Sequence, residues 1–256
     1  MIEKINVLLL GGGKTKTSMK RFSGEESKAL IKIGPENKPM ILHVIESFQK
    51  AKYISKIIVA GPPKVRQLLE NKSILTVSEG QTIYETVKIG LSYLKEDSIV
   101  MISTCDIPLV SEKHIDDFIE KCQQTPGFDI YYPIVSKKNY LEFYPSLDLR
   151  RTYANFVNGS FTGGNILLIN PIIIYKYGDV IKEFIQFRKH PLKMARLLGT
   201  QIASKYLRKY LTIQDLEKRV SILLGGYKGK AILSSPEISL DIDKPRHLKA
   251  FWGNYQ

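Results

Sequence analysis

The 256-residue sequence is poor in the residues that cross-link secreted proteins or bind transition metals. It contains two cysteines, Cys105 and Cys122, and four histidines. The cysteines are too few for a disulfide framework and lack C-x-x-C spacing, and the histidines are scattered without the spacing of metal ligands. These shortages argue against a disulfide-rich secreted protein and against a zinc module, and a cytoplasmic location is expected.

Long apolar runs and acidic residues are also scarce. No apolar run reaches the length that spans a membrane, and there is no charged start followed by an apolar region and a cleavage site. We therefore expect a soluble protein. The 25 acidic residues are outnumbered by 38 lysines and arginines, which gives a formal net charge of +13. Such a charge favours an anionic ligand, a nucleic acid or an acidic membrane surface as partner.

Apolar runs alternate with amphipathic stretches through the first half of the chain. The runs predict strands, and the stretches between them predict helices. Strands are expected at residues 5–10, 54–60, 73–77 and 98–103, and helices at 39–50, 63–70, 82–94 and 111–124. This alternation indicates an α/β fold, with a Rossmann-like, doubly wound and mostly parallel mixed sheet that binds ligands at the carboxyl ends of its strands.

The second half of the chain is less regular. Strands are expected at 129–135 and 164–169, mostly loop at 136–160, a basic helical region at 171–210, a short strand at 231–233, an extended segment at 239–243, and a helix after Pro245. No internal repeat or low-complexity tract is found. The simplest organisation is therefore one domain, 1–256, with a helical insertion at roughly 172–228.

The first predicted strand ends at three glycines, Gly11, Gly12 and Gly13, and many cations follow. Because glycine has no Cβ, the backbone N–H groups of such a loop can close on an anion. The cations that would neutralise this anion are Lys14, Lys16, Lys20, Arg21 and Lys28.

Two common phosphate-binding fingerprints do not fit this loop. A Walker A loop requires glycine where Leu8 stands, and G-x-G-x-x-G is met by Gly11 and Gly13 but broken at Lys16. A plain strand-to-helix turn is the alternative, but such turns seldom carry so many cations. We therefore predict a nucleotide-phosphate site of a third kind.

A carboxylate follows the apolar strand predicted at 98–103. Asp106 comes directly after this strand, and Pro108 turns the chain away. A carboxylate there points into the crevice at the end of the sheet, where it could bind Mg²⁺ together with phosphate. The alternative is that Asp106 only caps the helix that begins near Ser111. Its neighbour Cys105 has no histidine partner in the sequence, so a buried thiol is expected there.

Two further carboxylates, Asp241 and Asp243, lie in the extended segment near the end of the chain. Alternation along a strand would direct both to the same side. Two carboxylates on one face repel each other unless a cation stabilises them. A cation site and a surface pair tolerated by solvent are equally consistent with this segment.

These motifs, in this order, resemble the MobA-like nucleotidyltransferases. The resemblance lies in Leu10 to Gly13, Arg21, Lys28 to Leu30, Asn37 to Ile41, the Thr104-Cys105-Asp106 turn, and Asp243 in Asp-Ile-Asp-Lys-Pro. This superfamily has the GT-A fold (the nucleotide-diphospho-sugar transferase fold), and its enzymes make nucleotidyl molybdenum cofactor, CDP-methylerythritol, CMP-sugar acids and NDP-sugars. The resemblance implies a Mg²⁺-dependent enzyme that transfers NMP from an NTP to a phosphate- or hydroxyl-bearing small molecule and releases pyrophosphate.

The resemblance also implies roles for particular residues. The nucleotide would be bound by Leu10, Gly11, Gly12, Gly13, Lys14, Arg21, Lys28, Gly80, Thr82 and Asp106, of which Lys28, Arg21 and Asp106 would be catalytic. Mg²⁺ would be bound by Asp106 and Asp243, with Asp241 as the alternative to Asp243. The segment at Gly80 lacks the usual Ser/Asn pattern of the relatives, so the choice between CTP and GTP stays open.

An acceptor site is predicted from Arg151, Thr162, Gly163, Gly164 and Asn165, with Arg150 nearby. The glycines allow close backbone approach, the Thr and Asn side chains can hydrogen-bond, and arginine suits a small anionic acceptor. A plain turn before a strand is equally consistent with the segment 162–165.

Two other classes of function stay open. A GT-A glycosyltransferase would use an NDP-sugar and a D-x-D motif, and Asp241-Ile242-Asp243 has that spacing. A basic nucleic-acid or membrane-surface module would use residues 182–209, although no nucleic-acid motif with aromatic stacking spacing is present there.

The basic region also carries Leu198, Ile202 and Tyr206 at four-residue spacing, which needs a surface to pack against. We expect it to form a lid over the acceptor side of the crevice, with contact to an anionic membrane as the alternative. The expected partners are thus an NTP and a small anionic acceptor, without nucleic acid, and homodimer formation is left open.

Overall fold

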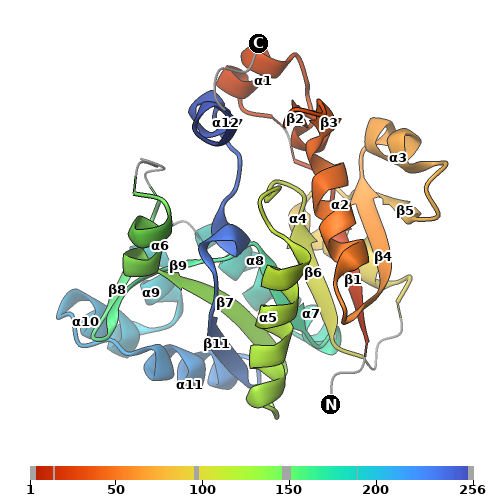
Figure 1. Ribbon diagram of the computed structural model, residues 1–256. Coiled ribbons are helices and arrows are strands. Elements are labelled where there is room, and N and C mark those ends of the chain that lie inside the picture. The colour runs from red at the N-terminus through yellow and green to blue at the C-terminus, as the bar shows by residue number, and fades with distance from the viewer. Residues whose placement is uncertain (1–3, 14, 95–97, 146–150, 189, 253–256) are drawn as a thin grey trace.

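The protein folds around one large mixed sheet. The computed structural model describes residues 4–13, 15–94, 98–145, 151–188 and 190–252, with 251 and 252 described by their backbone alone. Within these residues the sheet has nine strands in the order β5-β4-β1-β6-β10-β7-β9-β8, and β11 pairs with β7. Figure 1 shows helices on both faces of this sheet, which confirms the expected doubly wound α/β fold.

The parallel strands lie in one half of the sheet. They are β1 (Ile5–Leu10), β4 (Ile54–Gly61), β5 (Leu75–Ser78) and β6 (Val100–Thr104). Leu10 of β1 pairs with Thr104 of β6 in register. Because both strands end at the same level, the glycine loop and the Asp106 turn leave the sheet side by side.

The other half of the sheet is largely antiparallel. It contains β7 (Ile130–Ser136), β8 (Ala154–Phe156), β9 (Gly159–Gly163), β10 (Ile166–Ile169) and β11 (Gly229–Leu233). β10 runs antiparallel to both β6 and β7, and β9 pairs antiparallel with β7 nearer the end of that strand. This half carries the predicted acceptor segment towards the end of β6.

Alternate residues of β1 build two cores, as the period of a strand requires. Val7 and Leu9 belong to one cluster and Leu8 to the other. The first cluster is covered by α2 (Met40–Lys50), α3 (Pro63–Leu69) and α5 (Glu112–Gln124), and the second by α4 (Ile83–Leu91) and α7 (Ile172–Lys176). Phe118 of α5 is fully buried in the first core.

The segment after β1 and the C-terminal helix pack against each other. This part comprises α1 (Thr17–Ser23), η1 (Lys28–Leu30), the pair β2 (Lys32–Ile33) and β3 (Lys38–Pro39), and α12 (Pro245–Trp252). Met19, Ile242 and Leu248 are buried in one cluster, and Figure 1 shows α1 and α12 as neighbours. Residues near both ends of the chain therefore meet beside the ends of the parallel strands.

The described residues between α7 and β11 form four more helices: α8 (Gly178–Phe187), α9 (Pro191–Leu197), α10 (Thr200–Leu207) and α11 (Ile213–Leu223). Their apolar stripe of Leu198, Ile202 and Tyr206 packs in a small core with Phe184 of α8 and Phe156 of β8. The stripe thus finds its packing surface within these helices and on β8. The lid function remains a prediction.

The loop prediction for residues 136–160 is wrong in two places. α6 (Lys137–Phe143) begins where Ser136 Oγ accepts the N–H of Asn139 at 3.0 Å, and it buries Tyr140. β8 and β9 form an antiparallel hairpin in which the rings of Phe156 and Phe161 lie 6.0 Å apart between centroids. Both elements are too short for their period to stand out in a polar stretch.

The strand expected in the extended segment 239–243 does not form either. Residues Pro236–Ser239 form the 3₁₀ turn η2, and residues 240–243 have no regular secondary structure. Within the described residues this segment therefore pairs with no strand of the sheet.

The stability of the first core should depend on Phe118. Replacing it with alanine removes a fully buried ring, so we expect Phe118→Ala to lower the free energy of unfolding by about 3–5 kcal/mol. Phe143, whose side chain is 65% exposed, provides the matched control, and Phe143→Ala should cost less than about 0.5 kcal/mol. Urea denaturation measures both, and equal losses in the two variants would contradict this assignment of the core.

Candidate active site

The glycine loop follows β1 and is held against two neighbouring segments. Gly13 has φ +116°, a conformation that favours glycine, and its carbonyl accepts the N–H of Lys28 at 3.4 Å. A Cβ on Gly11 would press at 3.2 Å on the side chains of Ile41, Val59 and Val65. The loop therefore needs glycine for close packing as well as for its turn. Lys14 lies outside the described residues.

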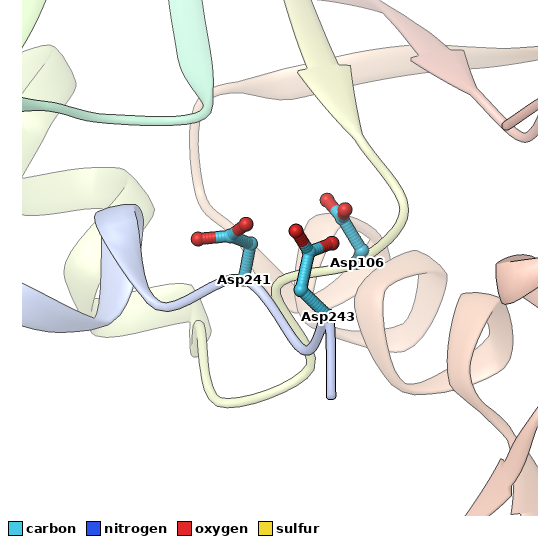
Figure 2. Close-up of side chains that lie close together, drawn as sticks. All are labelled: Asp106, Asp241 and Asp243. Atoms are coloured by element: carbon cyan, nitrogen blue, oxygen red, sulfur yellow. The ribbon is translucent and has the colours of Figure 1, made fainter. Parts of the chain in front are cut away.

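Three carboxylates gather where β6 ends. One oxygen each of Asp106, Asp241 and Asp243 can be chosen so that all lie within 4.8 Å of one another. Figure 2 shows the three carboxyl groups directed to the same side of the two loops that carry them. The N–H of Ile242 donates to the carbonyl of Asp106 at 2.8 Å and joins these loops. Oxygen donors at this spacing suit Mg²⁺, which prefers hard carboxylate ligands.

The convergence of Asp241 and Asp243 was expected, but from a strand that does not form. Their carboxylates meet because the irregular segment 240–243 is bonded to the Asp106 turn. Both residues lie in the cluster, so the structure includes each of the two alternatives for the second metal ligand.

Asp106 is held in place by its own strand. Thr104 Oγ1 donates to Asp106 Oδ1 at 2.6 Å. The N-cap of α5 is Ser111, in a capping box with His114, so the alternative that Asp106 serves as the helix cap is wrong. Burial raises the pKa of the Cys105 thiol, and nearby Asp106 raises it further. Cys105 is therefore the expected buried thiol.

Cations balance each member of the acidic cluster. Lys28 Nζ lies 2.8 Å from Asp106 Oδ2 and also pairs with Asp243. Lys16 is a second partner of Asp243, and the Arg151 guanidinium lies 3.1 Å from Asp241 Oδ1. These contacts bring cations from two separate segments, the one after β1 and the one before β8, to one group of carboxylates.

The pKa values of the cluster follow from burial and these pairs. Burial alone would lower the pKa of Lys28, but Asp106 and Asp243 outweigh it and raise that pKa. Burial alone would raise the pKa of Asp243, but Lys28 and Lys16 hold it well below its usual range. Both groups are therefore charged at neutral pH.

The predicted acceptor segment packs against β7 and η2. Thr162 and Gly163 lie in β9, while Gly164 and Asn165 join it to β10. A Cβ on Gly163 would overlap the Tyr132 hydroxyl, and one on Gly164 would crowd Ile238 at 2.7 Å. The glycines thus allow close approach, here between parts of the protein.

Asn165 joins the end of β6 to η2, the turn that directly precedes the acidic loop (residues 240–243). Its carbonyl accepts the N–H of Thr104 at 3.1 Å, its own N–H donates to Ile238 at 2.9 Å, and its side-chain amide donates to the Ser239 carbonyl at 3.3 Å. Arg151 lies beside the cluster through Asp241, and its guanidinium is 5.8 Å from the Tyr140 ring centre. Arg150 lies outside the described residues. Acceptor binding by these residues remains a prediction.

The remaining predicted nucleotide residues have structural roles of their own. Thr82 is the N-cap of α4 and accepts the N–H of Glu85 at 3.1 Å, and the N–H of Gly80 donates to Thr86 Oγ1 at 3.0 Å. Arg21 lies on α1 and is exposed. Their contact with a nucleotide remains a prediction.

Sequence reasoning missed three residues at the site. Lys16 was counted among the cations that follow the glycines but was given no role at the site, and it pairs with Asp243. The Glu79 carboxylate lies where a Cβ on Gly12 would be; its place after β5 was the available signal. His247, which is buried, accepts the N–H of Asp243, and no local pattern pointed to it.

A glycine loop and an acidic cluster at the carboxyl end of a doubly wound sheet define a nucleotide-binding α/β protein. The family model of the MobA-like NTP transferase domain matches residues 7–212. The chain therefore belongs to the MobA-like NTP transferase family. In the described part of the chain, no helix combines the length and the apolar character needed to cross a membrane.

Two curated relatives match part of the chain. It is 26% identical over 123 residues to 2-C-methyl-D-erythritol 4-phosphate cytidylyltransferase of Halalkalibacterium halodurans, covering 45% of this chain and 53% of that protein. It is 28% identical over 123 residues to the "Probable molybdenum cofactor guanylyltransferase" of Thermococcus sibiricus, covering 46% and 56%. The chain thus spans about half the length of the curated relatives it matches.

Solved structures match nearly the whole chain. A hypothetical transferase from Thermus thermophilus is 27% identical with a TM-score of 0.78, covering 96% of this chain and 99% of that one. The 4-diphosphocytidyl-2C-methyl-D-erythritol synthase of Anaerococcus prevotii is 12% identical with a TM-score of 0.58, covering 97% and 96%. At that identity the second match shows the shared fold alone.

Lys28 should stabilise the fold as well as the site. Its side chain is 16% exposed, between carboxylates that are 14% and 8% exposed. Lys28→Met would leave Asp106 and Asp243 facing each other, so we expect the free energy of unfolding at pH 7 without divalent metal to fall by about 3–5 kcal/mol. Urea denaturation measures this change.

The matched control is Lys121→Met, which breaks the exposed pair of Lys121 with Asp117 on α5. This variant should lose less than about 1 kcal/mol. If Lys28→Met loses no more than the control, Lys28 does not balance the cluster.

Proposed function

We propose that the protein is a Mg²⁺-dependent nucleotidyltransferase that transfers NMP from an NTP to a small acceptor and releases pyrophosphate. The observation that carries this proposal is the meeting of the glycine loop with Asp106, Asp241 and Asp243 at one edge of the sheet. Family membership and the names of the curated relatives, a cytidylyltransferase and a guanylyltransferase, support the same reaction class.

The role proposed for each residue at the site follows from its charge. The N–H groups of the glycine loop, with Lys28, Arg21, Lys14 and Lys16, would neutralise the triphosphate oxygens. Asp106 and Asp243 would hold Mg²⁺, with Asp241 beside them. Mg²⁺ bound there would stabilise the negative charge that develops around the α-phosphate.

The acceptor oxygen attacks the α-phosphorus as the bond to the pyrophosphate oxygen breaks, so the chain must align the two substrates and balance charge. No protein nucleophile is needed, which agrees with the buried, neutral thiol of Cys105. Arg151 would hold the anionic group of the acceptor, because its guanidinium already lies beside the cluster through Asp241.

The nucleotide is proposed to be CTP or GTP, because the curated relatives are named as a cytidylyltransferase and a guanylyltransferase. A GT-A glycosyltransferase, the competing enzyme class, would contain the same Asp241-Ile242-Asp243 spacing but would release NDP from an NDP-sugar. The released product therefore separates the two classes: pyrophosphate supports the proposal, and NDP supports the competing class.

Asp106→Asn tests the metal site. The amide oxygen can still accept the Thr104 hydroxyl, but the negative charge that binds the cation is lost. We expect pyrophosphate release to fall by at least about a hundredfold. The assay combines CTP or GTP with Mg²⁺ and a panel of sugar and polyol phosphates, and the melting temperature monitors the fold.

Asp117→Asn, which removes a half-exposed carboxylate on α5, is the matched control and should keep full activity. Full Mg²⁺-dependent activity in Asp106→Asn would refute the role of Asp106.

Arg21→Ala tests the triphosphate site. Arg21 is exposed on α1, so its removal should leave the fold intact while one phosphate charge loses its partner. We expect NTP affinity in the presence of Mg²⁺ to fall by about tenfold or more, measured by calorimetry. Arg208→Ala, an equal change of charge at the end of α10, should bind NTP like the wild type. Unchanged affinity in Arg21→Ala would show that the triphosphate uses other cations.

A further inference from the structure

His247 is a buried polar side chain to which the proposed reaction assigns no role. It lies on α12, is 5% exposed, and comes four residues after Asp243. Its Nδ1 lies 3.2 Å from the backbone N of Asp243 and 3.2 Å from the carbonyl oxygen of Asp241. One ring atom thus lies at hydrogen-bond distance from the backbone of both Asp241 and Asp243.

Nδ1 lies between a donor and an acceptor of the loop backbone. The Asp243 amide can only donate to Nδ1 and the Asp241 carbonyl can only accept from it, so Nδ1 bonds the first in the tautomer with its proton on Nε2 and the second in the other tautomer. Nε2 is buried and has no hydrogen-bond partner within the described residues. An apolar side chain would fill this position without a buried, unpaired ring nitrogen, so packing alone does not account for histidine here.

The acidic loop has no regular secondary structure to hold it. Its backbone is fixed to the rest of the protein by the Ile242 N–H bond to the Asp106 carbonyl at 2.8 Å and by the Asp243 N–H bond to His247. The first bond sets the distance between the two loops. The second acts on the residue whose carboxylate must stay near Asp106.

We infer that His247 is a positioning residue for the metal site: its Nδ1 holds the backbone of Asp243 so that the carboxylate stays within the acidic cluster. The inference rests on the proposed function for the assignment of Asp243 as a metal ligand. Residues that orient ligands in this way typically change metal affinity by about 10–100-fold when they are removed.

Two substitutions separate positioning from packing. In His247→Asn, Oδ1 stands the same number of bonds from Cα as Nδ1 and can accept the Asp243 N–H, but the side chain is smaller than the ring. In His247→Leu, the side chain fills more of the space but offers no acceptor. A packing role predicts that leucine is tolerated better, and a positioning role predicts that asparagine is.

The first measurement is Mn²⁺ binding, followed by electron paramagnetic resonance with CTP or GTP present. We expect His247→Leu to weaken Mn²⁺ binding by about 10–100-fold and His247→Asn to stay within about threefold of the wild type. The Mg²⁺ concentration for half-maximal pyrophosphate release should move in the same order, while kcat at saturating Mg²⁺ changes less. If His247→Leu does not fold, His247→Met, which likewise offers no nitrogen or oxygen acceptor, takes its place.

The control is His43→Leu, which removes a half-buried histidine on α2 whose Nε2 lies 3.4 Å from the Ile33 carbonyl. It should bind Mn²⁺ like the wild type. Unchanged Mn²⁺ binding in His247→Leu, or weaker binding in His247→Asn than in His247→Leu, would overturn the inference. So would a wild type that binds no Mn²⁺ with either nucleotide. If the wild type and the variants bind Mn²⁺ in the expected order but the wild type releases no pyrophosphate, the proposed function is refuted and this inference stands.

Discussion

The site depends on charge balance among Asp106, Asp241 and Asp243. Three carboxylates within 4.8 Å of one another repel strongly unless cations lie between them. Lys28 and Lys16 come from the segment after the first strand, and Arg151 comes from the segment before β8. The buried contact of Met19 with Ile242 and Leu248 holds the segment after the first strand against the C-terminal segment that carries Asp241 and Asp243. The same electrostatic requirement therefore links residues from both ends and the middle of the chain.

This balance joins stability to the proposed chemistry. Lys28 neutralises two carboxylates in the folded protein. In the proposed reaction Mg²⁺ would neutralise these carboxylates and Lys28 would face the triphosphate. Asn165, Gly163 and Gly164 contribute through packing, because they let β7 and η2, the turn that precedes the acidic loop, lie close to the end of β6. The predicted acceptor segment thus helps to build the site even before any acceptor contact is considered. Close backbone approach, the property that suggested a ligand there, serves the fold directly.

Local patterns were reliable where many residues share one period. The alternation in β1 and the helical spacing in α2 and α5 each involve several buried side chains, so their strands and helices were predicted within a few residues. α6 buries Tyr140 within a polar stretch, and β8 has three residues. Such short elements carry too few periodic positions to be recognised. The segment at 239–243 misled for the opposite reason, because alternating residues suggested a strand where η2 and an irregular loop form.

The sequence by itself determined the succession of strands and helices, the glycine loop after β1 and the carboxylate after β6, because each depends on neighbouring residues. It also determined the order of motifs that led to the family. Tertiary structure alone decided that Asp241 and Asp243 both reach Asp106, that Lys16 joins them, and that His247 holds the backbone between them. Some of these contacts join residues more than two hundred positions apart in the sequence. Their distances are set by the register of β1 with β6 and by the packing of α12 on α1, which no local pattern encodes.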